Sequence, residues 1–125
     1  MEIVLPSEEY THETAPDGRI ITRCTMRQIV LHTIGLNDSG SSRHRPYTRH
    51  GRKFYRPWRN YFSAYLGDAP WDYLYMAGYA DHGSVHPSQY GKETTYWLTR
   101  KGLDWLGEQL GITIYDEEDR KWKMT

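Results

Sequence analysis

Hydrophobic side chains recur at the spacing of an α-helix in several stretches of the chain. The first stretch covers 25–34, where Thr25 and Gln28 form a T-x-x-Q capping box. Gly35 follows it and suits the left-handed conformation that ends many helices. The apolar residues at helical spacing are Met26, Ile29, Val30 and Ile34. This pattern predicts a first helix over 25–34.

Two further helices are predicted in the middle of the chain. The stretch 58–66 places large apolar side chains on one side and follows Pro57, a residue that suits the first position of a helix. The stretch 69–79 has similar periodicity, and Asp68 can cap its first turn.

The pattern changes after the third of these helices. Turn residues fill 82–91, and 93–99 is β-branched and aromatic with partial alternation, which predicts a strand. Thr99 can cap a last helix over 100–110, and Gly111 can end it. The leucines at helical spacing in this last helix are Leu103, Leu106 and Leu110.

The remaining segments give weaker signals. Residues 2–5 and 112–115 have the composition of short strands, whereas 19–22 fits either a short strand or a loosely ordered arm. The stretch 37–57 is rich in glycine, proline and serine, which predicts a long loop. The expected organisation is an N-terminal arm at 1–24, a domain at 25–111 and a charged C-terminal tail at 112–125.

Two spaced motifs lie in the last part of the chain. The first has the form L-x-x-x-G followed by an apolar residue, and the second has the form Y-x-L-T-x-x-G-x-x-x-L. The residues that match them are Leu74, Gly78, Tyr79, Tyr96, Leu98, Thr99, Gly102 and Leu106. The pair resembles the end of a winged helix-turn-helix domain of the MarR and PadR kind. The resemblance implies an α+β fold with three to four helices, a β-hairpin wing and a long basic loop after the first helix.

Charge is segregated along a chain that is neutral as a whole. The 16 Lys and Arg residues balance the 16 Asp and Glu residues, yet no acidic residue occurs from 39 to 67. The acidic residues concentrate in the first seventeen positions and at 116–119. Aromatic residues make up 14% of the chain, enough to build a core of rings and leave some for a partner. We therefore expect one strongly positive face on a neutral molecule.

The candidate binding residues are cations and rings of the stretch from Arg43 to Phe62, which we call the basic segment. Arginine can neutralise phosphates, and aromatic side chains can stack on unpaired bases. The candidate residues, with two cations added from the wing and the last helix, are Arg43, Arg45, Arg49, Arg52, Lys53, Arg56, Arg59, Tyr47, Tyr55, Lys92 and Arg100. Two other interpretations remain open: the cations contact an acidic protein, or they are simply solvated or structural.

The predicted helix at 69–79 argues against sequence-specific recognition of DNA. It carries no cation and no amide, whereas reading bases requires such side chains, and its Asp72 would repel phosphate. Tyr73 and Tyr75 favour protein contact instead.

Two functions follow as hypotheses. The segments 31–36 and 59–62 resemble small phage and prophage proteins, so the first is a small phage-type regulator that binds the backbone of DNA or RNA. The second is an inhibitor or adaptor that holds an acidic surface of a host complex, such as a nucleic-acid-handling defence system.

Other functional classes find little support in the sequence. Cys24 is the only cysteine, His82 and His86 lie in a turn region, and no nucleophile, metal or phosphate-loop motif occurs, so we expect neither an enzyme nor a cofactor. No apolar run suits a membrane span or a secretory signal. The resemblance to small phage and prophage proteins also implies the cytoplasm of a bacterial host cell. A homodimer through the last helix and Trp105 is a further expectation.

Overall fold

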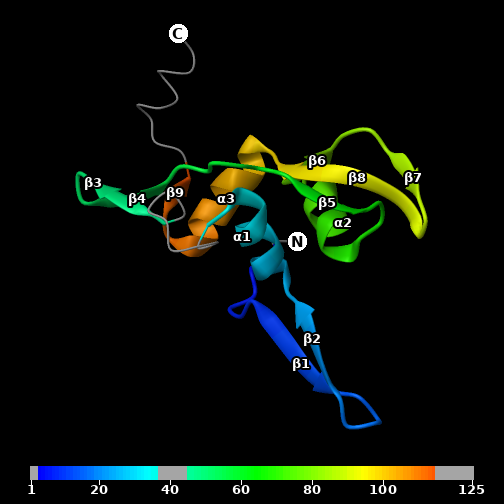
Figure 1. The fold of residues 1–125 in the computed structure, drawn as a ribbon. Helices are drawn as coiled ribbons and strands as arrows, with labels where there is room; N and C mark the ends of the chain where they lie inside the picture. The colour runs from blue at the N-terminus through cyan, green and yellow to red at the C-terminus, as the bar shows by residue number, and fades with distance from the viewer. Residues whose placement is uncertain (1–2, 37–44, 115–125) are drawn as a thin grey trace.

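The computed structural model describes residues 3–36 and 45–114, and these fold into helices and strands arranged in three sheets (Figure 1). More of the described residues lie in strands than in helices. The helices are α1 Met26–Ile34, α2 Ala69–Met76 and α3 Arg100–Leu110. The strands are β1 Tyr10–Thr14, β2 Ile20–Cys24, β3 Tyr47–Arg49, β4 Arg52–Tyr55, β5 Phe62–Tyr65, β6 Ala80–His82, β7 His86–Ser88, β8 Gly91–Leu98 and β9 Thr113–Ile114.

The largest sheet is antiparallel and is organised around β8. The strand order is β5-β8-β6, and β7 also pairs with β8. Alternate residues of β8 point into the protein, so Thr94, Tyr96 and Leu98 are buried while their neighbours are more exposed. The indole of Trp71 in α2 stacks on the Tyr96 ring with centroids 5.0 Å apart. This ring pair joins α2 to the sheet, and burial raises the pKa of the Tyr96 phenol.

The core lies where α1 and α3 meet this sheet. Val30, Ile34 and Leu106 are fully buried and belong to the same apolar cluster as Trp71 and Tyr96. The N-terminal segment is tied to α3 as well, because the Trp105 indole donates to the carbonyl of Ile3 at 2.8 Å. A further hydrogen bond of 2.9 Å runs from the Leu5 amide to Gln109 Oε1. Residues 3–5 are therefore packed as irregular chain, and the strand expected at 2–5 is wrong for the described part.

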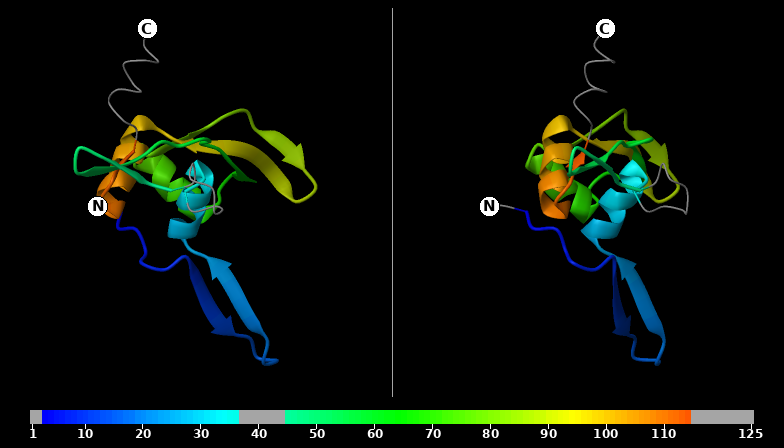
Figure 2. Two further views of the ribbon diagram at one scale, coloured as in Figure 1. Left: turned by 60° about the vertical axis from the view of Figure 1, so that its left-hand side comes forward. Right: turned by 90° about the vertical axis from the view of Figure 1, so that its left-hand side faces the viewer.

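An antiparallel hairpin of β1 and β2 projects away from the rest of the protein (Figures 1 and 2). Almost all of its residues are exposed, and Gly18 forms its turn with φ of 87°. Arg23 and Glu13 form an ion pair of 2.9 Å across its two strands. The structure thus resolves the alternative at 19–22 in favour of a strand, which here belongs to an extended arm.

The expected winged helix-turn-helix fold is wrong. The stretch 58–66 contains strand β5 in place of a helix, and Phe62 pairs with Tyr96 of β8. Phe62 and Ala64 turn inward while Ser63 and Tyr65 turn outward, so the segment follows the period of a strand. Without that helix, the described residues between α1 and α2 form strands β3, β4 and β5, and the described part of the chain contains no helix-turn-helix. The protein is instead a strand-rich α+β structure.

The helices predicted at 25–34, 69–79 and 100–110 and the strand predicted at 93–99 are confirmed with small changes of boundary. The helix expected at 25–34 is α1, and it ends at Gly35, whose φ of 74° is left-handed. The Thr25 side chain accepts no hydrogen bond from the first turn of α1, so the predicted cap does not form, and its hydroxyl donates to the carbonyl of Glu8. Thr99 does cap α3, where its hydroxyl accepts from the Gly102 amide at 3.1 Å. Strand β8 confirms the strand predicted around 93–99, and β9 lies within the segment 112–115.

Gly102 allows α3 to approach the chain before β6, and its replacement tests this contact. A Cβ on Gly102 would lie 1.9 Å from the Tyr79 carbonyl oxygen, which is backbone and has little room to move. We expect Gly102→Ala to destabilise the fold by about 1–3 kcal/mol, as overpacking of a core does. Urea unfolding measures the change. Glu108→Ala, an exposed change in the same helix, serves as control. Equal stability of the two variants would contradict the close contact.

Candidate functional site

Residues 47–55 of the basic segment form a hairpin, in contrast to the loop expected at 37–57. Strands β3 and β4 are antiparallel, with Tyr47 opposite Phe54 and Arg49 opposite Arg52. His50 and Gly51 form the turn and both have positive φ, of 53° and 75°. Positive φ at both central residues is the geometry of the two-residue turn that matches the twist of a hairpin. The part 37–44 of the expected loop, which includes Arg43, lies outside the described residues.

One side of this hairpin collects arginines and rings. Side chains alternate along a strand, and residues opposite one another share a face. Arg45 and Arg56 continue the alternation beyond the strand ends and line the same cavity as Tyr47 and Arg49. We call this side the guanidinium–ring face, and it consists of Arg45, Tyr47, Arg49, Arg52, Phe54 and Arg56.

Within the guanidinium–ring face, cations lie over rings. The Tyr47 and Phe54 rings stack with centroids 5.9 Å apart. The guanidinium carbons of Arg49 and Arg56 lie 5.8 and 5.5 Å from the centre of the Tyr47 ring, and that of Arg52 lies 5.7 Å from the centre of the Phe54 ring. Cation–π attraction holds the guanidinium groups in place and leaves them charged. The face is therefore a preorganised array of positive charge.

The opposite side of the hairpin anchors it to the protein. Tyr55 is fully buried, and its hydroxyl donates to the carbonyl of Ile34 at the end of α1, at 2.8 Å. Strand β4 also pairs in parallel with β9, where Tyr55 lies opposite Ile114. Tyr55 was expected to contact a partner, and its burial in the core shows that this assignment is wrong.

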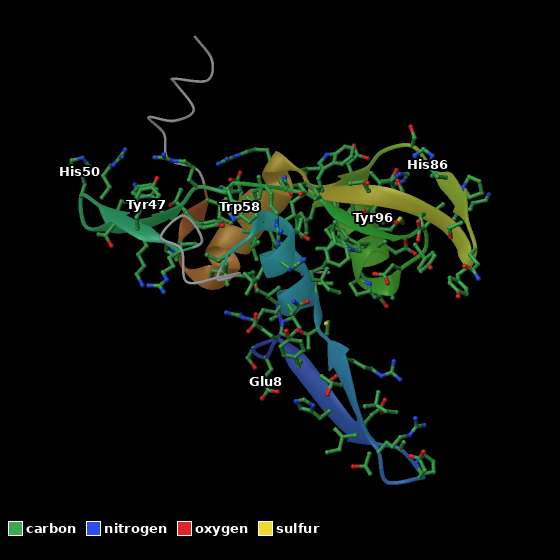
Figure 3. The ribbon with its side chains drawn as sticks, in the orientation of Figure 1. Glu8, Tyr47, His50, Trp58, His86 and Tyr96 are labelled. Atoms are coloured by element: carbon green, nitrogen blue, oxygen red, sulfur yellow. The ribbon has the colours of Figure 1, made fainter. Side chains whose placement is uncertain are left out.

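A cavity of about 380 Å³ opens beside the guanidinium–ring face. Two of the side chains that line it, Tyr47 and Trp58, are labelled in Figure 3. Its lining residues are Arg45, Tyr47, Arg49, Arg56, Pro57 and Trp58. The Trp58 indole donates to the carbonyl of Gly35 at 3.2 Å and remains 40% exposed. Phe54 and Trp58, two rings of the basic segment, join the candidate residues at this place. The mirror pattern R-P-Y-T-R and R-K-F-Y-R on either side of His50-Gly51 is the signal that could have found the face.

Arg59 has a structural role at the end of α1. Its Nε donates to the carbonyl of His32 at 3.0 Å, and its guanidinium lies 4.7 Å from the centre of the Trp58 ring. A cation is favourable at this position, because the last carbonyls of a helix carry partial negative charge. Arg59 therefore fastens Trp58 and α1 together beside the candidate site.

The remaining predicted cations are spread over the protein. Lys53, together with Arg52 of the guanidinium–ring face, borders a groove of about 690 Å³ that Asp104 and Glu108 also line. Arg100 pairs with Asp104 at 2.8 Å. Lys92 lies opposite Pro87 in the β7–β8 hairpin, at the far end of the molecule from β3 and β4 (Figure 1). The structure therefore does not bring Lys92 together with the basic hairpin.

Helix α2 has the character expected from its sequence. Tyr73, Tyr75 and Met76 are exposed, and the helix carries no cation. Burial raises the pKa of the Asp68 carboxyl at its start, and the neighbouring Asp72 carboxylate adds to the effect. An acidic helix start is unsuited to phosphate. Trp105 of α3, expected at a dimer interface, is 5% exposed and stacks on Tyr79, so its ring belongs to the core.

Within residues 3–36 and 45–114, no cluster of three or more His, Cys, Asp or Glu side chains could hold a metal ion. No helix in the same residues is long and apolar enough to cross a membrane. No protein-family model, curated protein or solved structure matches the chain.

The buried hydroxyl of Tyr55 can be tested as the anchor of the hairpin. Tyr55→Phe removes one hydrogen bond and leaves the Ile34 carbonyl unpaired, so we expect a loss of about 1 kcal/mol in the free energy of unfolding. Denaturant unfolding measures this loss. Tyr65→Phe removes a hydroxyl from an exposed tyrosine and is expected to be neutral. Equal stability of Tyr55→Phe and the wild type would count against the anchor.

Proposed function

We propose that this protein binds the phosphate backbone of a nucleic acid through the guanidinium–ring face. The observation that carries the proposal is the gathering of Arg45, Arg49, Arg52 and Arg56 on one side of a short, tightly turned hairpin. No carboxylate occurs between residues 39 and 67, so this face has no acidic group of its own segment beside its cations. Such an array attracts a polyanion.

Phosphate suits this arrangement better than a single carboxylate does. A guanidinium presents a planar fork of donors that can hold two oxygens of one phosphate. On each strand of this face two arginines lie four residues apart with a ring between them, so positive charge is repeated along the hairpin and suits a ligand with repeated anionic groups. Each phosphate that is neutralised also releases counterions, and this release supplies most of the affinity of backbone binding.

The proposal concerns the backbone and leaves out base recognition by a helix. Helix α2 has no cation, and its start carries Asp68 and Asp72. Binding is therefore expected to tolerate changes of nucleotide sequence. The resemblance to small phage proteins supports placing this activity in a bacterial cell during phage infection.

A second candidate function is the inhibition of a host complex by protein contact. The observation that favours it is the exposed cluster of Tyr73, Tyr75 and Met76 on α2, because tyrosine and methionine are enriched in protein interfaces. In this case the basic hairpin would contact an acidic protein surface of a nucleic-acid-handling complex.

Titration of a labelled oligonucleotide at increasing salt tests the first function. We expect the logarithm of the binding constant to fall linearly with the logarithm of salt between about 50 and 200 mM. The variant Arg45→Gln with Arg52→Gln should bind at least tenfold more weakly at about 50 mM salt and reduce the slope by about 2, since each phosphate contact contributes about one unit. Fluorescence anisotropy measures both quantities.

The matched control is Arg19→Gln with Arg23→Gln. It removes the same charge from the β1–β2 arm, where Arg19 and Arg23 pair with Asp17 and Glu13. An equal loss of affinity in both variants would show that only net charge matters and would refute a site on the hairpin. Absence of binding at about 50 mM salt, together with one defined host complex recovered by the wild type, would favour the second function.

A further inference from the structure

The lining of the cavity beside Trp58 favours a ligand that combines two properties. Its volume of about 380 Å³ is within the range of small-molecule sites, which begins at about 300 Å³. Aromatic side chains and Pro57 give it flat apolar walls, and three arginines surround them. A ligand that satisfies this lining is both planar and anionic, as a nucleotide is.

Contacts with Gly35 and Arg59 hold the indole of Trp58 in one orientation and leave part of it accessible. Its Nε1 donates to the Gly35 carbonyl, and the Arg59 guanidinium lies over the ring. The absence of a side chain on Gly35 allows the indole to lie this close to the backbone, because a Cβ at that position would lie 2.2 Å from Trp58 Nε1. Despite these contacts the side chain is 40% exposed. An aromatic ring that is oriented in advance at the surface is a suitable platform for stacking, since little entropy remains to be lost on binding.

We infer that this cavity receives an unpaired nucleotide, and that the protein therefore prefers single-stranded nucleic acid to duplex. The inference rests on the proposed function and names its substrate class. The base of an unpaired nucleotide can stack against Trp58 while its phosphates contact Arg45, Arg49 and Arg56. In a duplex the bases are paired and stacked inside, so a base reaches such a cavity only by flipping out. A duplex would engage the guanidinium groups alone.

The larger groove bordered by Arg52 and Lys53 does not suit the same ligand. Its wall includes Asp104 and Glu108, and both carboxylates would repel phosphate. Among the described residues that line the cavity at Trp58, none is acidic. Between this groove and the cavity at Trp58, the cavity is therefore the better site for a nucleotide.

Replacement of Trp58 separates stacking from charge. We expect Trp58→Leu to weaken binding of a single-stranded oligonucleotide of about 16 nucleotides by roughly tenfold, and to change binding of a duplex of equal length by less than about twofold. Trp58→Phe retains a ring and should keep single-strand affinity within about threefold of the wild type. Trp97→Leu, on strand β8, is the matched control and should leave both affinities unchanged. Thermal unfolding of each variant checks that it is folded.

A second measurement does not require Trp58→Leu to fold. Stacking of a base should quench the fluorescence of the wild type on addition of oligothymidine, and this quenching should be lost in Trp58→Phe although binding persists. Retention of the full quenching in Trp58→Phe would overturn the inference.

The outcomes distinguish the inference from the proposed function. Trp58→Leu can leave single-strand binding intact, or weaken single-strand and duplex binding equally. If the Arg45 and Arg52 variant still loses both kinds of binding, either result means that the cavity is not a nucleotide site, whereas backbone binding stands. If the Arg45 and Arg52 variant binds as the wild type does, the proposed function itself fails. Equal displacement of the oligonucleotide by polyglutamate from the wild type and from Trp58→Leu would also overturn the inference, because charge alone would then explain occupancy.

Discussion

The burial of Tyr55 is the constraint on which the arrangement of the basic hairpin depends. Its ring lies in the core and its hydroxyl donates to the last turn of α1. Because neighbouring side chains of a strand point to opposite faces, an inward Tyr55 sends Phe54 and Arg56 to the other side. The pairing of β3 with β4 then places Tyr47 on the same side as Phe54, and Arg49, two residues further along β3, lies on that side as well. One buried ring thus orients the whole guanidinium–ring face.

Aromatic residues serve two purposes in this protein, and their surroundings separate them. Trp71 and Tyr96 are stacked and fully buried, where they connect α2 with the main sheet. Tyr47 and Trp58 remain partly exposed, and guanidinium groups lie over both rings. A buried ring contributes through the apolar area removed from water, whereas a surface ring beside arginines can offer its face to a ligand. The low aliphatic content of the chain is therefore compatible with both a packed core and a binding surface.

The cations predicted to contact a partner do not form one functional group. Arg59 stabilises the end of α1 and the position of Trp58, and Arg100 pairs with Asp104 within α3. Lys92 lies at the opposite end of the molecule. In contrast, none of the ion pairs between described residues involves Arg45 or Arg52. The position of each cation in the fold therefore decides whether it can contact a polyanion.

The sequence by itself determined the elements whose signals are local. The spacing of leucines, the Thr99 cap and the glycine stops located α3, and the alternation around Tyr96 located β8, because capping and side-chain periodicity depend on neighbouring residues alone. The segregation of charge also marked 43–59 as the candidate site. Only the tertiary structure decided that 58–66 holds a strand, since Phe62 gains its burial from pairing with Tyr96, which is distant in sequence. It also decided which face each arginine occupies, because that depends on a turn register and on Tyr55 finding its partner at the end of α1.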